Sequence, residues 1–177
     1  SERTLRLEKA KLREVCGYGR RERRHSDDDR SDYRPDGIQL DMLLGFFEGW
    51  RRSVSPEEHL ELLRRSDHVV LALDGGPDAQ ALDTDPAPDH HAAPDAAVDR
   101  VVGFITAISD GVLAAYIPLL EVLPDYRGQG IGTELVRRLL RRLNGLYMVD
   151  VLCDPDVQPF YARLGMLPST GMMIRRV

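Results

Sequence analysis

The stretch that decides the fold is Val122-Leu-Pro-Asp-Tyr-Arg127-Gly-Gln-Gly130-Ile-Gly132-Thr-Glu-Leu-Val136. It joins an apolar run over 112–123, which predicts a strand, to an amphipathic run over 133–143, which predicts a helix. Three glycines remove Cβ atoms at the start of that helix, where the first N–H groups have no intrahelical partner. With the positive end of the helix dipole and the guanidinium of Arg127, these groups predict an anion-binding turn suited to phosphate.

Two well-known phosphate-binding motifs do not match this turn. A P-loop ends in Gly-Lys-Ser/Thr, whereas Ile131-Gly132-Thr133 contains no lysine. A dinucleotide fingerprint has G-x-G-x-x-G in the first βαβ unit, whereas the spacing here is G-x-G-x-G and several predicted strands precede it. A glycine-rich turn without a ligand is the remaining alternative at this stage.

Length and composition predict one ordinary domain. The chain has 177 residues, 42% of them hydrophobic and 30% charged, with a net charge of −5. The negative charge disfavours a broad nucleic-acid-binding surface. Because there is no uncharged apolar run of membrane-spanning length and no signal-peptide pattern, we expect a cytoplasmic protein without a membrane partner. Cys16 and Cys153 do not form a metal-ligand cluster, so no metal is expected.

The remaining sequence divides into a charged arm and a domain of alternating elements. Residues 1–31 are expected to form the arm, in which Leu5, Leu12 and Val15 allow one short helix. Residues 32–177 form the domain, with a disordered loop over the Asp-, Ala- and Pro-rich residues 75–99. Ser55-Pro56-Glu57-Glu58 predicts a capping box, and Asp110-Gly111 predicts a hairpin turn. The expected strands are 32–40, 68–74, 100–109, 112–123, 147–153 and 172–177, and the expected helices are 42–50, 56–65, 133–143 and 159–164.

Two motifs within this order resemble the GNAT superfamily of N-acetyltransferases. Arg127, Gly130 and Gly132 match its Arg/Gln-x-x-Gly-x-Gly/Ala motif. The later run Phe160-Tyr161-Ala-Arg-Leu164-Gly165-Met166 is similar to its Phe-Tyr-x-x-Leu-Gly-Phe segment, with Met in place of the final aromatic residue. The resemblance covers residues 32–177 and implies an α/β fold. In that fold about six to seven strands form a mixed central sheet, about four helices flank it, and strands four and five splay apart in a V.

The resemblance also implies an activity and its partners. Members of this family transfer an acetyl group from acetyl-CoA to an amine, which predicts an N-acetyltransferase acting on a primary amine, as a monomer or a homodimer. A non-catalytic acyl-CoA-binding sensor or regulatory module of the same fold is the alternative. The residues implied to hold acetyl-CoA are Leu120, Val122, Leu123, Arg127, Gly128, Gln129, Gly130, Ile131, Gly132 and Thr133.

Catalytic and acceptor-binding residues follow from the same resemblance. Tyr161 matches the tyrosine that protonates the departing thiolate. Glu121, at the end of the fourth predicted strand, is the candidate base or amine-orienting acid, with Asp150 or water as alternatives. A base is useful because only about one lysine-like amine in 2,500 is neutral at pH 7. Acceptor-pocket candidates are Phe46, Phe47 and Trp50, together with His59. The sequence does not identify the acceptor.

Overall fold

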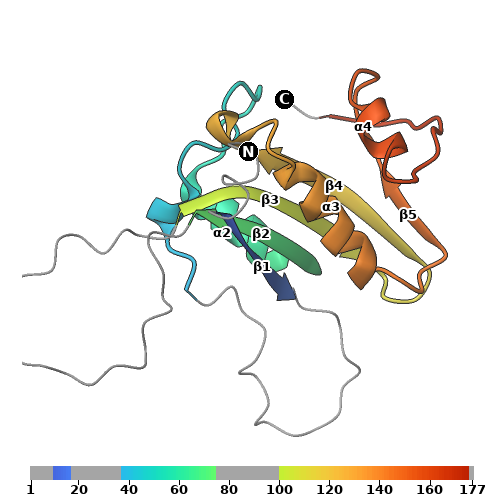
Figure 1. Ribbon diagram of the computed structural model, residues 1–177, viewed down its shortest axis with the longest axis horizontal. Coiled ribbons are helices and arrows are strands. Elements are labelled where there is room, and N and C mark those ends of the chain that lie inside the picture. The colour runs from blue at the N-terminus through green and yellow to red at the C-terminus, as the bar shows by residue number, and fades with distance from the viewer. Residues whose placement is uncertain (1–9, 17–36, 75–99, 176–177) are drawn as a thin grey trace, which may run out of the picture.

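The strands form one mixed sheet. The computed structural model describes residues 10–16, 37–74 and 100–175, so the expected loop over 75–99 lies outside the described residues. Within them, five strands pair in the order β1-β2-β3-β4-β5 (Figure 1). Neighbours from β1 to β4 are antiparallel, and β5 is parallel to β4. The strands are β1 (Ala10–Cys16), β2 (His68–Asp74), β3 (Arg100–Ser109), β4 (Ala114–Val122) and β5 (Met148–Val151).

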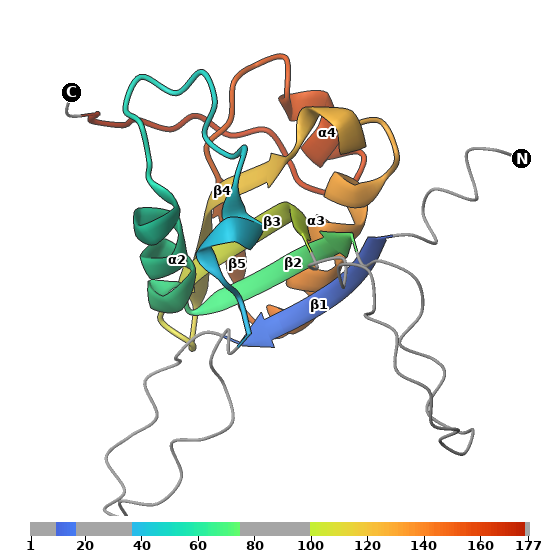
Figure 2. The same cartoon turned by 90° about the vertical axis from the view of Figure 1, so that its left-hand side faces the viewer.

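Helices cover both faces of this sheet (Figure 2). Helix α3 (Ile131–Arg142) packs on β2 and β3 from one side, and α2 (Pro56–Arg65) lies on the other side with the 3-10 helix η1 (Leu40–Leu43). A short 3-10 helix, η2 (Pro124–Tyr126), precedes α3, and α4 (Gln158–Ala162) follows β5. Because both faces are covered, β2 and β3 are buried along most of their length and lack an exposed polar side. No helix in the described ranges combines the length and apolar character needed to cross a membrane.

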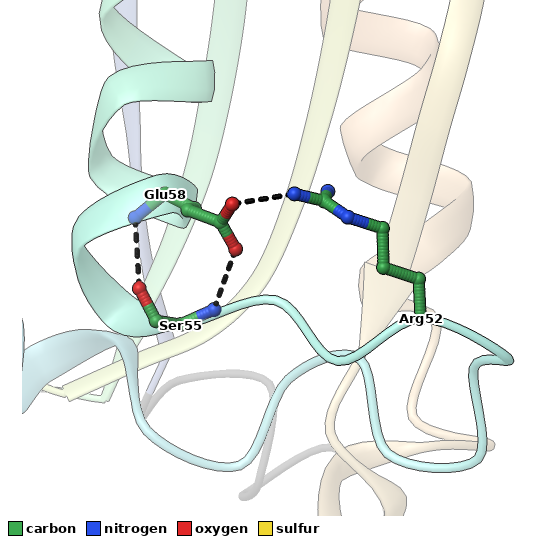
Figure 3. A network of polar contacts seen from close by, with 3 residues as sticks. All are labelled: Arg52, Ser55 and Glu58. Carbon is green, nitrogen blue, oxygen red and sulfur yellow. Dashed lines mark hydrogen bonds and ion pairs between the residues drawn. The ribbon is translucent and has the colours of Figure 1, made fainter. Parts of the chain in front are cut away.

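The start of α2 confirms the predicted capping box (Figure 3). The Glu58 N–H donates to the Ser55 hydroxyl oxygen, and the Ser55 N–H donates to the Glu58 carboxylate, each over 3.2 Å. Arg52 adds an ion pair to that carboxylate. The box satisfies N–H groups that a helix start leaves without partners, so the entrance of α2 is well defined.

The hairpin between β3 and β4 is also confirmed. The Asp110 Oδ1 atom accepts hydrogen bonds from the N–H groups of Val112, Leu113 and Ala114, and Gly111 has a φ of 71°. A carboxylate that accepts several backbone N–H groups reverses the chain within a few residues. These N–H donors also lower the pKa of Asp110.

The segment over 37–50 differs from the expected strand and helix. No strand occurs over the described residues 37–40. The helix expected over 42–50 is replaced by the 3-10 helix η1 followed by irregular turns. The reason is backbone conformation: Gly45, Phe47 and Gly49 all have positive φ values, which a right-handed helix cannot contain. A large apolar run had indicated a helix, but its two glycines and the unusual Phe47 produce a loop.

The two ends of the chain also differ from expectation. Ala10–Cys16 pairs with β2 as a strand, where the sequence allowed a short helix within a charged arm, so these residues join the sheet. At the other end, residues 172–175 form no strand. The described chain therefore has five strands and three α-helices, and the predicted totals of six to seven strands and about four helices are wrong.

Strands β4 and β5 separate partway along their length. Pairing joins Ala114–Ile117 to Met148–Val151 and stops before Pro118. A proline lacks the N–H group that a ladder requires, so the pairing ends where Pro118 enters the strand. Figure 1 shows the two strands diverging toward the end of the molecule where α4 lies. This is the predicted V between strands four and five.

Candidate functional site

The open half of β4 is the first component of the site. Residues 119–122 pair with β3 on one side, and residues 118–122 have no partner strand on the other among the described residues. Alternate residues of a strand direct their N–H and C=O groups to opposite edges, so part of this backbone is available to a ligand. Leu120 and Val122 are half-buried here, and the side chain of Leu123 is buried.

The glycine turn that follows is the second component. The backbone N–H groups of residues 128–133 make no hydrogen bond with the rest of the described chain. Gly128 and Gly130 have φ values of 72° and 86°, so the turn needs the left-handed backbone region at both positions. Gly130 is the N-cap of α3, whose first N–H groups carry the positive end of the helix dipole. These unpaired donors fit an anion.

Arg127 connects these two components. Its Nε atom donates to the Val122 carbonyl oxygen over 2.9 Å, which holds the exposed side chain between the end of β4 and the turn. The Gln129 side chain stabilises the same turn by donating to the Asp125 carbonyl oxygen. The predicted residues from Arg127 to Thr133 are therefore brought together with the open strand end.

Helix α4 packs against the start of α3. The nearest side-chain atoms to a Cβ added at Gly132 would belong to Phe160 and Val122, each at 3.8 Å. Phe160 also contacts the Tyr161 ring edge-to-face, with ring centroids 4.9 Å apart. The second sequence motif therefore lies beside the first one, although about thirty residues separate them in the chain.

Tyr161 is buried on α4. Burial is the main cause that raises the pKa of its hydroxyl to about 12, and Cys153 and Tyr116 contribute in the same direction. The hydroxyl is therefore protonated at neutral pH and can act only as a proton donor there. Burial likewise raises the pKa of Cys153, which argues against an activated thiolate.

Glu121 lies on the open half of β4 and reaches across to the loop after η1. Both carboxylate oxygens accept the Phe47 N–H, at 3.0 and 3.2 Å. Burial raises the pKa of Glu121, while the Phe47 N–H and the charge of Arg127 act against that shift. A carboxylate with a raised pKa approaches the range in which a general base works at neutral pH.

The acceptor-pocket candidates form an aromatic cluster beside Glu121. Phe46 and Phe47 are buried and contact the His59 ring, with centroids 5.1 and 4.9 Å away. Trp50 is 51% exposed and packs edge-to-face on Phe47. Phe46 and Phe47 are thus mainly part of the core, and Trp50 is the member of the cluster whose side chain is exposed to solvent.

Two site features differ from what the sequence indicated. Asp150 is exposed on β5, so the expected cost of a buried charge there does not arise. The contact between the Phe47 backbone and Glu121 was not predicted, because it depends on a φ of 62° at a non-glycine residue. Only the flanking Gly45 and Gly49 signalled that this segment would be irregular.

Comparison with known proteins agrees with this geometry. The family model described as the acetyltransferase (GNAT) family matches residues 45–166. A solved structure of a candidate acetyltransferase from Deinococcus radiodurans R1 is 36% identical, with a TM-score of 0.69 over 96% of this chain and 90% of that one. A GNAT-family acetyltransferase from Streptococcus pneumoniae TIGR4 is 25% identical, with a TM-score of 0.54 over 78% of this chain and 92% of that one.

Curated relatives match over a shorter region. GCN5-related N-acetyltransferase 3, chloroplastic, of Arabidopsis thaliana is 37% identical over 83 residues, which is 44% of this chain and 35% of that protein. The uncharacterized N-acetyltransferase ycf52 of Porphyra purpurea is 33% identical over 70 residues, which is 38% of this chain and 40% of that protein. The match thus spans well under half the length of these relatives. The extent of the family match and the shared fold show that this chain belongs to the GNAT acetyltransferase family.

Proposed function

We propose that this protein transfers the acetyl group of acetyl-CoA to a primary amine. The observation that carries the proposal is the junction of two sets of unpaired backbone groups. The open half of β4 ends in the turn whose N–H groups over 128–133 have no partner in the described chain. Arg127 connects the two through its bond to the Val122 carbonyl.

This junction suits the two chemically different ends of acetyl-CoA. The N–H groups of residues 128–133 and the Arg127 guanidinium are donors for the pyrophosphate oxygens. The free edge of β4 near Leu120 and Val122 can pair with the amides of an extended pantetheine arm, as an added strand would, and the Val122 C=O on this stretch already accepts the Arg127 Nε–H. When bound, acetyl-CoA supplies the activated thioester, and β4 N–H groups can stabilise negative charge on its carbonyl oxygen.

Glu121 is proposed to accept the proton of the amine, directly or through a water molecule. A protonated amine has no lone pair with which to attack, so a base beside it raises the reactive fraction. A carboxylate has about four acceptor sites, so its bonds to the Phe47 N–H leave capacity for a proton. Asp150 lies exposed on β5, away from the contacts that hold Glu121.

Tyr161 is proposed to protonate the leaving thiolate. Its pKa of about 12 keeps the hydroxyl protonated at neutral pH, and α4 lies beside the start of α3 through Phe160.

Trp50 offers the exposed aromatic surface on the acceptor side, while Phe46 and Phe47 support it from the core.

Incubation with acetyl-CoA and a panel of primary amines tests the proposal, with free thiol as the readout. We expect thiol release that depends on both the protein and an amine, and an acetylated amine of the matching mass. Saturable acetyl-CoA binding without thiol release for any amine would instead support a non-catalytic acyl-CoA-binding module. The engagement of both Glu121 oxygens by Phe47 is the feature that favours this second function.

A further inference from the structure

A small pocket lies between the loop after η1 and the entrance of α2. Its volume is about 190 Å³, and it is lined by residues 43–47, residues 54–56 and His59. None of these residues carries an acidic or a permanently charged basic side chain. Burial of a charged group without a partner is costly, so the lining favours an uncharged occupant.

His59 gives this pocket an unused polar group. The residue is 1% exposed, and neither ring nitrogen makes a hydrogen bond of ordinary length and angle within the described chain. Burial lowers the pKa of His59 to about 4, and a weak hydrogen-bonding contact with the Leu43 backbone partly opposes that shift, so the ring is neutral at neutral pH. A neutral imidazole offers one donor and one acceptor. Buried polar groups in folded proteins usually have partners, so this unpartnered ring points to a ligand.

The pocket shares a wall with the proposed reaction site. Phe47 lines the pocket, and its N–H donates to the Glu121 carboxylate on the open half of β4. Its positive φ, between Gly45 and Gly49, places this wall in a strained loop. The His59 nitrogens have almost no exposed surface, so direct contact with a ligand requires a small shift of this loop.

We propose that the pocket binds an uncharged aromatic ring of the amine acceptor and that His59 hydrogen-bonds a hydroxyl group on that ring. This inference rests on the proposed function and identifies the acceptor class as a hydroxylated aromatic amine. A cavity of about 150 Å³ is known to hold benzene, so the volume here suits one ring with a small polar substituent. Polycationic acceptors do not match a pocket without carboxylates.

Trp50 provides a binding assay that does not require acetyl-CoA. It is the one tryptophan of the chain, and its ring packs on Phe47 at a centroid distance of 5.2 Å. Selective excitation of Trp50 fluorescence during titration with tyramine or phenethylamine compares two amines that differ by one hydroxyl group. We expect tyramine to bind about tenfold more tightly, because its hydroxyl gives a desolvated imidazole a partner.

The matched variants are His59→Phe and His68→Phe. The first keeps an aromatic ring and removes both nitrogens, and should abolish the preference for tyramine. His68, on β2, is a partly buried histidine that also has an unpartnered Nδ1 atom but does not line the pocket, so its variant should keep the preference. Equal affinities in the parent protein, or a preference that persists in His59→Phe, would overturn the proposal.

A second measurement covers the case in which His59→Phe does not fold. The ¹⁵N shifts of the His59 ring in the parent protein should change with tyramine and stay nearly constant with phenethylamine. Unchanged shifts at saturating tyramine would contradict the proposal. The binding assay contains no acetyl-CoA, so its outcome is independent of the thiol-release assay. A preference for tyramine without thiol release for any amine would refute the transferase while supporting the pocket, and thiol release without a hydroxyl preference would do the reverse.

Discussion

Tyr161 makes the most specific residue-level prediction about chemistry. Tyr161→Phe keeps the buried ring and removes only the hydroxyl, whose pKa of about 12 keeps it protonated. We expect turnover to fall by at least about 10²-fold, because general-acid assistance commonly contributes about 10²–10⁴-fold. Acetyl-CoA affinity should change little. Steady-state rates with an amine that the parent protein acetylates check this, and near-parental turnover would leave water as the proton donor.

His59 predicts a pH dependence of stability. Its pKa in the folded protein is about 4, below the ordinary value of 6.5, so the unfolded chain binds a proton first as pH falls. The contribution of His59 to stability is therefore fully present above pH 6.5. It is lost progressively as pH falls from 6.5 to about 4, and the loss levels off below that value. Over that range the parent should lose about 3 kcal/mol more free energy of unfolding than His59→Phe. Urea titrations at several pH values measure the difference, and parallel pH profiles for the two proteins would contradict it.

The residues of the site were predictable to different degrees. Arg127 and the glycines of the candidate site could be proposed from their spacing, and the positive φ values at Gly128 and Gly130 give a backbone reason for glycine at those two positions. The contact between Glu121 and the Phe47 N–H could not, because it joins positions 74 residues apart through a conformation rare for phenylalanine. Burial of His59 depends on three surrounding aromatic rings, which local sequence does not reveal.

At the scale of elements, the best predictions rested on local chemistry. The Ser55–Glu58 capping box fixed the start of α2, and Asp110 fixed the β3–β4 turn, because each motif satisfies its own nearby N–H groups. The segment over 42–50 was misjudged because its apolar content resembles a helix, while Gly45, Phe47 and Gly49 adopt positive φ values that a right-handed helix excludes. β1 was missed because pairing with β2, a non-local contact, decides its conformation.

The connection between β2 and β3 allows a test at this scale. Asp74 and Arg100 are register partners, so the two strand ends are adjacent and a short linker can join them. Replacement of residues 77–97 with a short Gly-Ser turn should preserve a cooperative thermal transition near the parental midpoint. The reason is that loop-closure entropy changes slowly with loop length.

Calorimetry of the shortened protein checks this expectation. A Gly-Ser segment of the original length is the control that separates the effect of loop length from the effect of composition. Loss of the cooperative transition in both variants would show that the replaced residues contribute essential packing. Loss in the short variant alone would show that the linker strains the strand ends.

At the scale of the whole molecule, topology assembles the site from distant parts of the chain. The open half of β4 and the start of α3 are consecutive in sequence, whereas α4 and the loop after η1 approach them from opposite ends of the described chain. Separation of β4 from β5 after Ile117 creates the opening between these parts. The spacing of the motif predicted that β4 leads into the start of α3, and the family resemblance predicted the V between β4 and β5. The loop after η1 could be placed only with the tertiary structure.

The central claim is that the turn over 128–133, together with the open half of β4, binds acetyl-CoA. Isothermal titration of acetyl-CoA into the parent, Gly130→Glu and Gly111→Glu proteins tests it most directly. Both glycines have positive φ, at 86° and 71°, so both variants add the same charge and similar backbone strain, but Gly111 lies in the β3–β4 turn. We predict saturable binding to the parent and to Gly111→Glu, and none to a folded Gly130→Glu. Absence of binding to the parent, or equal affinity of Gly130→Glu, would contradict the account.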